Sequence, residues 1–439
     1  MRILVLTNLY PPHQAGSTDL RCQAVTDALQ KRGHTLCVLT SNYGVGAEQR
    51  GREIERRLRL TGGFDQPPIP GFGALRALER HNGAVLRETL TDFQPELVLV
   101  GSLRGLSKSL TFRLRAAPVP TAYDVADDWI AGELRADPWL RWWNQTAPPT
   151  LSGLWRRWLE LSGGRTRADA LAPTRLMRGY DRIPEVYGTE AEVAAVPPAS
   201  VTAFRFDRLY FCSLALKAKT ANAGFQVEHG EVIYPGIRAE VFAGQIKPPS
   251  APVKKLLLVT RLEPGSGATT ALEALRLARE LKLPVSLSIY GRGESAYIAQ
   301  VRSFVVTHQL PVEFLTVANT SRDLAAVYHR HDALLYTAET EEPFAVAPLE
   351  AMAAGLPVIA AKSGGVRELV RHGENAFTYT PGDAPDLARR LQELQLQPAL
   401  RWQVTETAQT EVLTKFNESV MVDQIEEFLQ HTREFWQQT

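Results

Sequence analysis

The sequence predicts an α/β protein made of two domains, each with a doubly wound parallel sheet between layers of helices. Three observations predict this fold. Short apolar runs alternate with amphipathic runs, as in successive βαβ units. The alternation occurs in two separate series, with the Pro-rich stretch "FAGQIKPPSAPVKK" between them. At 439 residues and 44% hydrophobic content, the chain is too long for one ordinary core and long enough for two.

The first series occupies the first half of the chain. "RILVLT" and "TLCVLTS" are apolar runs separated by a loop and an amphipathic stretch, which is the pattern of a strand, a helix and a parallel strand. The pattern then repeats. Strands are predicted at residues 2–7, 35–41, 95–102 and 119–125, and helices at 20–31, 75–93 and 107–117.

The second series begins with "KKLLLVTR" and shows a more regular alternation. Strands are predicted at residues 254–261, 284–291, 312–317 and 332–338, and helices at 269–281, 295–308, 321–330, 347–355 and 384–396, with the segment "NAFTYTPG" before the last helix. Apolar residues at helical spacing from Met421 to Trp436 predict a long terminal helix that needs a surface to cover.

We therefore expect three parts: a first domain at 1–247, a second at 248–415, and a terminal helix at 416–439. Residues 139–206 fit the alternation poorly, because they are rich in Trp, Pro and Gly. We interpret them as an insertion in the first domain.

Composition excludes several functional classes. Lys and Arg number 49 and Asp and Glu 48, a net charge of +1, so no long-range field favours nucleic acid as a partner. The odd number of cysteines, Cys22, Cys37 and Cys212, argues against a disulfide framework or a cysteine metal cluster. The apolar run before Pro11 is short for a signal peptide, and no stretch approaches the roughly 20 apolar residues of a membrane span. We expect a cytoplasmic protein.

Two glycine-containing loops follow predicted strands and precede predicted helices. In α/β sheets such loops bind ligands, and a helix N-terminus there favours an anion. "PPHQAGST" contains Gly16, where the backbone can approach a phosphate, and "TRLEPGSGATT" contains the permanent cation Arg261. Neither loop is specific alone, and each is more often a structural turn.

The stretch "EEPFAVAPLEAMAAGLPVIAA" carries two carboxylates eight positions apart, Glu342 and Glu350. We expect Glu342 in the loop after a strand and Glu350 in the first turns of the next helix, where the macrodipole favours the charged form. Ionised carboxylates accept hydrogen bonds from paired hydroxyls, which a nucleotide sugar supplies on its sugar and its ribose. The alternative is a surface glutamate and a simple dipole partner.

Through most of its length the chain resembles the retaining GT-B glycosyltransferases of family 4. "LVLTNLYPPHQAGS", "LQKRGHTLCVLTS" and "VIYPGIRAEVFA" are similar to the first strand and Gly loop, the second strand and the interdomain approach of that family. "EEPFAVAPLEAMAAGLPVIAAKSGGVRELVRHGENAFTYTPGD" resembles its donor-binding core. The resemblance implies two Rossmann-like domains facing across a cleft, with the terminal helix crossing back to the first.

The resemblance also implies residue roles. Glu342 is expected to bind donor-sugar hydroxyls, Glu350 the ribose, Arg261 the diphosphate and Gly16 the same phosphates. The base is expected near "ANTSRDL". The residues expected in the donor site are Gly16, Ser266, Gly267, Phe344, Ala345, Val346 and Glu350, and those expected to act in transfer are Glu342, Arg261 and Asp127.

The implied reaction moves a sugar from a UDP- or GDP-sugar to a glycan, lipid or small-molecule acceptor, with retention at the anomeric carbon. No metal and no other cofactor is expected. The carboxylate pair is also typical of a glycosidase acid and nucleophile, but the resemblance makes both residues binding groups instead.

Four positions depart from the family pattern. Ser266 stands where a Lys is usual in R-x4-K, and Ala126 where a His or Arg is usual before Asp127. Ala15 replaces the first Gly of the N-terminal pair, and Arg238 an Asp. A catalytically weak GT-B subunit that binds nucleotide sugar or supports a partner enzyme therefore remains the alternative, ahead of a nucleotide-sugar epimerase.

Tryptophans and arginines gather at residues 139–158, a composition found in helices at a membrane surface or in acceptor grooves. The simpler interpretation, that these tryptophans pack the insertion onto its domain, is favoured. A peripheral contact with the inner face of the membrane is the alternative. His13, in the first Gly loop, is a further candidate near donor or acceptor.

Overall fold

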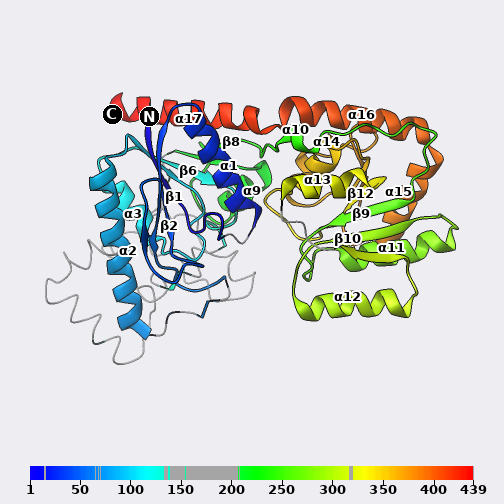
Figure 1. The fold of residues 1–439 in the computed structure, drawn as a ribbon, viewed down its shortest axis with the longest axis horizontal. Helices are drawn as coiled ribbons and strands as arrows, with labels where there is room; N and C mark the ends of the chain where they lie inside the picture. The colour runs from blue at the N-terminus through cyan, green and yellow to red at the C-terminus, as the bar shows by residue number, and fades with distance from the viewer. Residues whose placement is uncertain are drawn as a thin grey trace. The chain divides into compact units, whose positions relative to one another are not determined.

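The computed structural model describes residues 1–13, 16–64, 66–67, 69, 71–132, 137–138, 154, 206, 208–315 and 320–438. Two compact units make up the chain, Met1–Ile233 with Val422–Thr439, and Tyr234–Met421. Each contains a mostly or entirely parallel sheet with helices on it (Figure 1). The predicted α/β fold class is confirmed. The predicted insertion at 139–206 and its Trp/Arg segment lie almost entirely outside the described residues.

The sheet of the first unit has the strand order β3-β4-β2-β1-β5-β6-β7-β8, and only β3 is antiparallel to its neighbour. Its strands are β1 (Arg2–Leu6), β2 (Thr35–Ser41), β3 (Gln49–Arg50), β4 (Ile54–Leu58), β5 (Leu97–Val100), β6 (Thr121–Val125), β7 (Leu209–Phe211) and β8 (Glu231–Val232). Its helices are α1 (Ser17–Lys31), α2 (Gly71–Phe93), α3 (Ser109–Arg115), α9 (Leu214–Asn222) and most of α17 (Glu418–Gln438).

Strand β4 has a sequence, "IERRL", that predicts no strand, yet it pairs in parallel with β2. Its charged side chains are buried with partners. Arg56 donates to the carbonyl of Tyr10 at 2.9 Å, and Glu55 accepts from the hydroxyl of Thr89 at 3.0 Å. Buried polar groups are tolerated when they are hydrogen-bonded, so partners elsewhere in the fold make this strand possible.

From Val422 onward, helix α17 packs on the first unit. The ring of Phe428 meets Tyr210 of β7 edge to face at 5.0 Å. Arg32, at the end of α1, donates to Asp423 at 2.6 Å and to Glu426 at 2.7 Å. These contacts supply the surface that the amphipathic pattern of the helix requires.

The second unit has a fully parallel sheet in the order β11-β10-β9-β12-β13-β14. Its strands are β9 (Lys255–Val259), β10 (Ser286–Tyr290), β11 (Val312–Leu315), β12 (Ala333–Tyr336), β13 (Val358–Ala361) and β14 (Phe377–Tyr379). Its helices are α10 (Ala239–Phe242), α11 (Ala268–Glu280), α12 (Ser295–Thr307), α13 (Ser321–His329), α14 (Ala347–Ala353), a 3-10 helix (Gly364–Glu368), α15 (Ala384–Leu396) and α16 (Pro398–Lys415).

Side chains of alternate residues of β9 pack in two cores, one on each face of this sheet. Leu256 and Leu258 pack with α11, α12 and α15, whereas Leu257 packs with α10, α13, α14 and the second half of α16. The strand order reverses between β9 and β12, and ligands of doubly wound sheets bind at the carboxyl ends of the strands at this point.

The units divide between Ile233 and Tyr234, whereas the sequence predicts the joint near residue 247. Ile237, Ala239 and Phe242 explain the difference, because they are buried in the core of the second unit. The N–H of Ile237 also donates to the carbonyl of Phe416 at 2.9 Å. The Pro-rich stretch is therefore a surface segment of the second unit.

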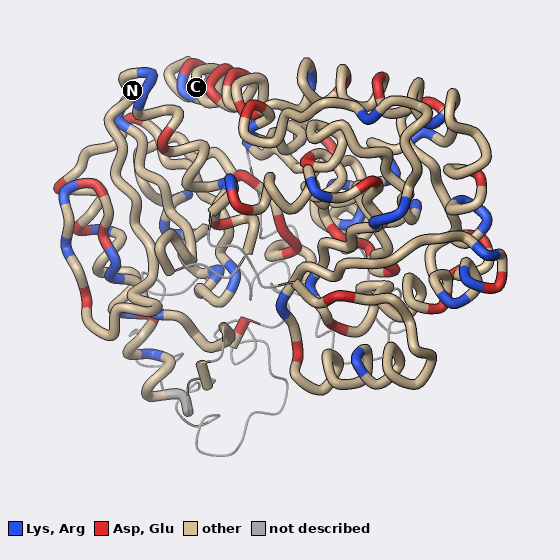
Figure 2. Tube along the Cα trace, turned by 45° about the vertical axis from the view of Figure 1, so that its right-hand side comes forward, with Lys and Arg blue, Asp and Glu red and all other residues tan. Residues whose placement is uncertain are grey.

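Basic and acidic residues are interspersed along the helices of each unit (Figure 2). Within the described ranges, no helix combines the length and apolar content needed to cross a membrane.

Candidate functional site

The loop from β9 to α11 carries Arg261, Ser266 and Gly267, and it packs on the end of β12. The hydroxyl of Thr337 donates to the carbonyl of Ser266 at 2.9 Å, and the N–H of Glu339 donates to the carbonyl of Gly265 at 2.9 Å. The structure thus brings the second Gly loop beside the segment that leads to Glu342, at the carboxyl ends of β9 and β12.

Gly267 is required by this packing. Its φ is +70°, and an added Cβ would lie 1.8 Å from the carbonyl oxygen of Thr337, inside any permitted contact. A side chain here would push the loop away from β12. Gly267 is therefore a structural glycine of the site, whatever it contributes to ligand binding.

Gly267→Ala is expected to destabilise the second unit, because the left-handed backbone alone costs about 1–2 kcal/mol and the clash adds to it. Thermal unfolding measures the loss. Gly373→Ala is the matched control, since Gly373 has φ +74° but open space around an added Cβ. Equal destabilisation by the two substitutions would show that the loop does not depend on this close packing.

Arg261 extends from the loop with 61% of its side chain exposed, and its Nε lies 3.9 Å from Glu263 Oε2. Ser266, in contrast, is buried. Its Oγ is 3.5 Å from the hydroxyl of Tyr297 and 3.4 Å from the N–H of Ala268. The two positions of the R-x4-K pattern therefore differ in environment, one open to solvent and one packed under the start of α11.

Glu342 lies in the loop after β12, as predicted, and its carboxylate is half-buried. Oε2 accepts a hydrogen bond from the buried hydroxyl of Tyr336 at 3.1 Å. Burial raises the pKa of Glu342, the bond from Tyr336 lowers it, and the charge of Glu263 adds to the increase.

The backbone of Glu342 is held by the first turn of the 3-10 helix. Its carbonyl accepts from the N–H of Gly365 at 3.0 Å. Gly364 has φ +49°, and a Cβ there would lie 2.2 Å from the same carbonyl oxygen. The two glycines of the G-G-x-x-E segment thus allow the backbone of this segment to approach the loop of Glu342.

Phe344, Ala345 and Val346 are half-buried and connect this loop to α14. Within the described part of the chain, no group accepts a hydrogen bond from their backbone N–H groups. These N–H groups therefore remain available as donors.

Glu350 lies in the first turn of α14, as predicted, and Oε2 accepts from the hydroxyl of Tyr328 at 2.7 Å. Burial raises the pKa of Glu350 to about 7, although the bond from Tyr328 lowers it. A first-turn dipole favours the charged form, whereas burial acts in the opposite direction and has the largest effect on this pKa.

Tyr328 and Tyr336 are the polar partners that the sequence does not reveal. Both lie in largely apolar segments, "LAAVYHR" and "ALLYTA", where a tyrosine reads as a core residue. Only the folded chain brings each hydroxyl to a carboxylate.

In the first unit, Gly16 and Asp127 lie after β1 and β6. Gly16 has an extended backbone, φ −170°, and an added Cβ would meet no atom within 4 Å, so the fold itself does not demand glycine there. Asp127 accepts from the hydroxyl of Ser102 at 2.7 Å and from the N–H of Trp129 at 3.2 Å. Both of its oxygens therefore have protein partners.

The remaining candidates lie near these loops or outside the described residues. Ala126 accepts a weak hydrogen bond from the thiol of Cys212 at 3.6 Å. His13 lies against Gly44, where an added Cβ would be 2.2 Å from its Nδ1. Arg238 donates to Ser321 at the start of α13 at 2.7 Å. Ala15 and the first part of "ANTSRDL" are not described.

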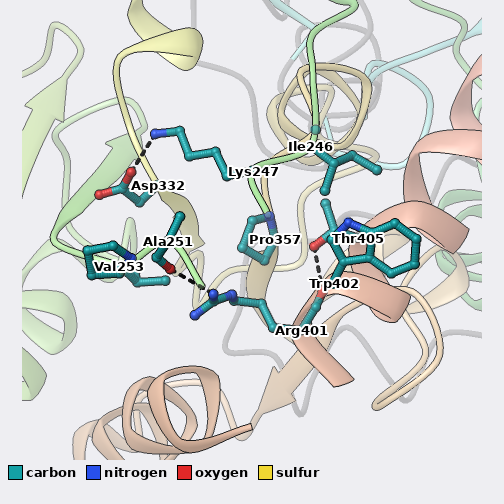
Figure 3. A pocket seen from close by; sticks show the side chains of 11 residues that line it. Ile246, Lys247, Ala251, Val253, Asp332, Pro357, Arg401, Trp402 and Thr405 are labelled. Carbon is teal, nitrogen blue, oxygen red and sulfur yellow. Dashed lines mark hydrogen bonds and ion pairs between the residues drawn. The ribbon is translucent and has the colours of Figure 1, made fainter. Parts of the chain in front are cut away.

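The second unit also has a pocket at the amino end of β12, where Asp332 precedes that strand (Figure 3). The candidate site described above lies at the carboxyl end of the same strand. Its charged groups have protein partners. Lys247 is paired with Asp332, and Arg401 donates to the carbonyls of Pro249 and Ala251 at 2.8 Å. These bonds hold the Pro-rich stretch to Asp332 and to α16. Because the charged groups of the pocket serve this structural purpose, we assign the pocket no chemical role.

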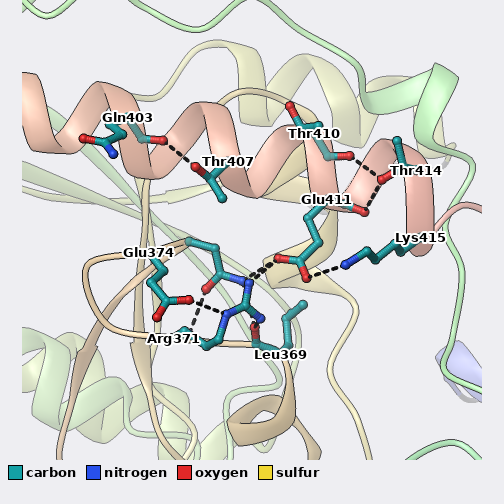
Figure 4. Close-up of polar contacts among 10 residues, drawn as sticks. Leu369, Arg371, Glu374, Gln403, Thr407, Thr410, Glu411, Thr414 and Lys415 are labelled. Carbon is teal, nitrogen blue, oxygen red and sulfur yellow. Dashed lines mark hydrogen bonds and ion pairs between the residues drawn. The ribbon is translucent and has the colours of Figure 1, made fainter.

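The loop before β14 is fastened in a similar way (Figure 4). Glu411 of α16 accepts from Arg371 at 2.7 Å and from the amide of Asn375 at 2.9 Å. Arg371 also donates to Glu374 at 2.8 Å. The polar residues of "RHGEN" thus hold the sheet edge to α16.

Sequence comparison matches residues 245–411 to the family model of glycosyl transferases group 1. Glycogen synthase of Mycobacterium tuberculosis is 28% identical over 214 residues, 48% of this chain and 51% of that protein. Phosphatidyl-myo-inositol mannosyltransferase of Mycobacterium leprae is 31% identical over 165 residues, 37% and 42% of the two chains. The chain spans about half the length of the curated relatives it matches.

Solved structures match over the whole chain. The Anabaena protein HepE, in complex with UDP and glucose, has a TM-score of 0.65 at 19% identity, covering 98% of this chain and 100% of that one. Sucrose-phosphate synthase of Thermosynechococcus elongatus has a TM-score of 0.67 at 16% identity, covering all of both chains. The chain therefore has the GT-B fold, and its segment 245–411 matches the glycosyl transferases of group 1.

Proposed function

We propose that this protein is a retaining glycosyltransferase that moves a sugar from a nucleotide-diphosphate sugar to an acceptor hydroxyl without a metal ion. One observation carries the proposal. Glu342 and Glu350 are half-buried carboxylates on the segment after β12, and N–H groups without described acceptors lie between them. This segment belongs to the part of the chain that matches group 1 glycosyl transferases.

In this proposal each polar group has one part of the donor to bind. Glu342 accepts hydrogen bonds from hydroxyls of the sugar, and Glu350 from the two hydroxyls of the ribose, because an ionised carboxylate offers only acceptors. The N–H groups of residues 344–346 and the exposed guanidinium of Arg261 bind the diphosphate. The roles that the family resemblance implies for Gly16 and Asp127 stay predictions.

The chemistry needs charge stabilisation at the leaving group. The bond from the anomeric carbon to the diphosphate oxygen breaks, the acceptor oxygen bonds to that carbon from the same face, and the proton of the acceptor hydroxyl passes to the departing diphosphate. Arg261 and the backbone N–H groups stabilise the charge that develops on the diphosphate. In this proposal they take the place that a metal ion has in other transferases.

The nucleotide is expected to carry uracil or guanine, and HepE, which shares the fold, has been crystallised with UDP-glucose. The acceptor is a glycan, a lipid or a small molecule. The names of the relatives differ in this respect, from glycogen to lipopolysaccharide and phosphatidyl-myo-inositol, so the fold does not select among them.

The test is an assay of the purified protein with a panel of UDP- and GDP-sugars and acceptors of all three classes, with and without EDTA. We expect transfer that retains the donor's anomeric configuration and is insensitive to EDTA. Inversion, or dependence on a metal, would overturn that part of the proposal. Donor binding without turnover by any acceptor class would favour a catalytically weak, nucleotide-sugar-binding subunit.

Ser266→Lys is expected to raise donor affinity or turnover, since it adds a cation beside the diphosphate, where a charge-assisted hydrogen bond contributes about 1.5–3 kcal/mol. Donor titrations of the variant measure the gain.

The control is Ser266→Met, which has a similar length and no charge. A gain with methionine as well would point to packing against Tyr297 rather than charge. If lysine lowers both affinity and turnover, the phosphate site is organised differently from the family pattern.

A further inference from the structure

Tyr328 is a buried side chain whose hydroxyl contacts the half-buried carboxylate of Glu350. Tyr328 is 0% exposed and lies on α13, with its ring edge to face against Phe242 of α10 at a centroid distance of 5.8 Å. Its hydroxyl is 2.7 Å from Oε2 of Glu350 and 3.5 Å from the carbonyl of Ala347. Packing against Phe242 and the hydrogen bond at the hydroxyl restrict the movement of the ring.

The two oxygens of Glu350 have different surroundings. A phenol has one proton to donate, and the short distance assigns it to Oε2. Oε1 has no hydrogen-bond partner among the described residues, and it is not one of the fully enclosed polar atoms that lack a partner. One oxygen is therefore held by the protein, and the other stays accessible.

We propose that Tyr328 is a positioning residue, whose hydroxyl holds Oε2 of Glu350 so that the carboxylate presents Oε1 to the vicinal hydroxyls of the donor ribose. The inference rests on the proposed function and adds to it the residue that orients the ribose-binding carboxylate. Without the hydroxyl, the Glu350 side chain can rotate away from the ribose, and an ordered acceptor is lost.

The electrostatics agree with this geometry. Burial raises the pKa of Glu350 to about 7, and the hydrogen bond from Tyr328 opposes that increase by favouring the anion. Among the described residues, Tyr328 is the titratable group that acts on Glu350, and the charge of Tyr290 acts on Tyr328. Removing the hydroxyl is expected to raise the pKa of Glu350 further.

The experiment is calorimetric titration of the full-length protein with UDP-glucose, and in a parallel series GDP-mannose, from pH 6 to pH 9. The variants are Tyr328→Phe, Glu350→Gln, their combination, and Tyr379→Phe. Tyr379 is the matched control, because it is a buried tyrosine whose hydroxyl has no hydrogen-bond partner in the described structure. Nucleotide sugars are suitable probes because they lack the terminal phosphate of free nucleotides, which titrates near pH 6.

We expect Tyr328→Phe to lower donor affinity at pH 7 about tenfold, and to shift the pH at which affinity rises upward by about one unit. In the Glu350→Gln background the same change is expected to have no further effect, because the coupling partner is gone. Tyr379→Phe is expected to bind as the wild type does.

The outcomes separate the two proposals. If the wild type binds neither nucleotide sugar, the proposed function fails. If it binds and Tyr328→Phe keeps the same affinity and pH midpoint, the positioning role fails. Should Tyr328→Phe not fold, 3-fluorotyrosine at position 328 gives the decisive measurement. Its more acidic phenol must shift the midpoint downward, and an unchanged midpoint would overturn the inference.

Discussion

Replacing Glu342 with alanine is expected to reduce sugar transfer about 10²- to 10³-fold, the range seen when one charge-stabilising group is removed from an active site. The carboxylate is the proposed acceptor for the donor-sugar hydroxyls, and its loop is held by the backbone bond to Gly365. The loop therefore persists without the side chain. Initial rates at saturating donor and acceptor measure the loss.

Two controls distinguish a chemical role from a loss of fold. Glu342→Ala leaves the buried hydroxyl of Tyr336 without its acceptor, which costs about 1–3 kcal/mol of stability. Glu342→Gln keeps an acceptor for Tyr336 and removes only the charge, so it is expected to fold like the wild type and still transfer poorly. Glu374→Ala, at an exposed ion pair with Arg371, is expected to be neutral. Full activity of Glu342→Ala would refute the role.

The second large effect is the pH dependence of donor binding through Glu350. With a pKa of about 7, this group is largely protonated at pH 6 and ionised at pH 8. Only the ionised carboxylate accepts from both ribose hydroxyls, so donor affinity is expected to rise about tenfold from pH 6 to pH 8 and then level off. Titration with UDP-glucose across this range measures the rise.

The stability of the folded protein changes with pH in the opposite direction to donor affinity. The pKa of Glu350 is higher in the folded protein than its ordinary value, so folding takes up a proton there. The contribution of Glu350 to the free energy of unfolding is therefore fully present below pH 4.5 and is lost as the pH rises through about 7. Bound donor hydroxyls offset this loss above pH 7.

Glu350→Gln isolates the effect, because glutamine has the same shape and does not titrate. We expect its donor affinity to be low and independent of pH over this range. A pH dependence that survives in this variant would assign the titration to another group.

The sequence was sufficient for the regular parts of the fold. The strands β1, β2 and β9 are predictable because strands covered on both faces are continuous apolar runs. The helices α11 and α17 are predictable because their apolar residues recur at the helical period of 3.6. The position of Glu342 is predictable because it follows the apolar strand "ALLYTA". The position of Glu350 in a helix is predictable because Gly355 and Pro357 mark the end of that helix.

Other features depended on contacts between distant residues. Strand β4 has no local signal in the sequence, because its charged residues Arg56 and Glu55 are hydrogen-bonded to the distant residues Tyr10 and Thr89. The place where the units divide also depends on such contacts, because proline content marks a surface stretch and not the edge of a core. The place of Ile237 in the core of the second unit decides that edge.

The sequence by itself determined which residue types are present: two carboxylates eight positions apart, an arginine and glycines at the ends of predicted strands. Only the tertiary structure decided their chemical state. The strand order brings the loops after β9 and β12 together, and burial raises the pKa of Glu350 to about 7. The hydroxyls of Tyr328 and Tyr336 each donate to one carboxylate oxygen, of Glu350 and Glu342 respectively. Neither the pKa nor these hydrogen bonds can be predicted from sequence, because both depend on neighbours in space.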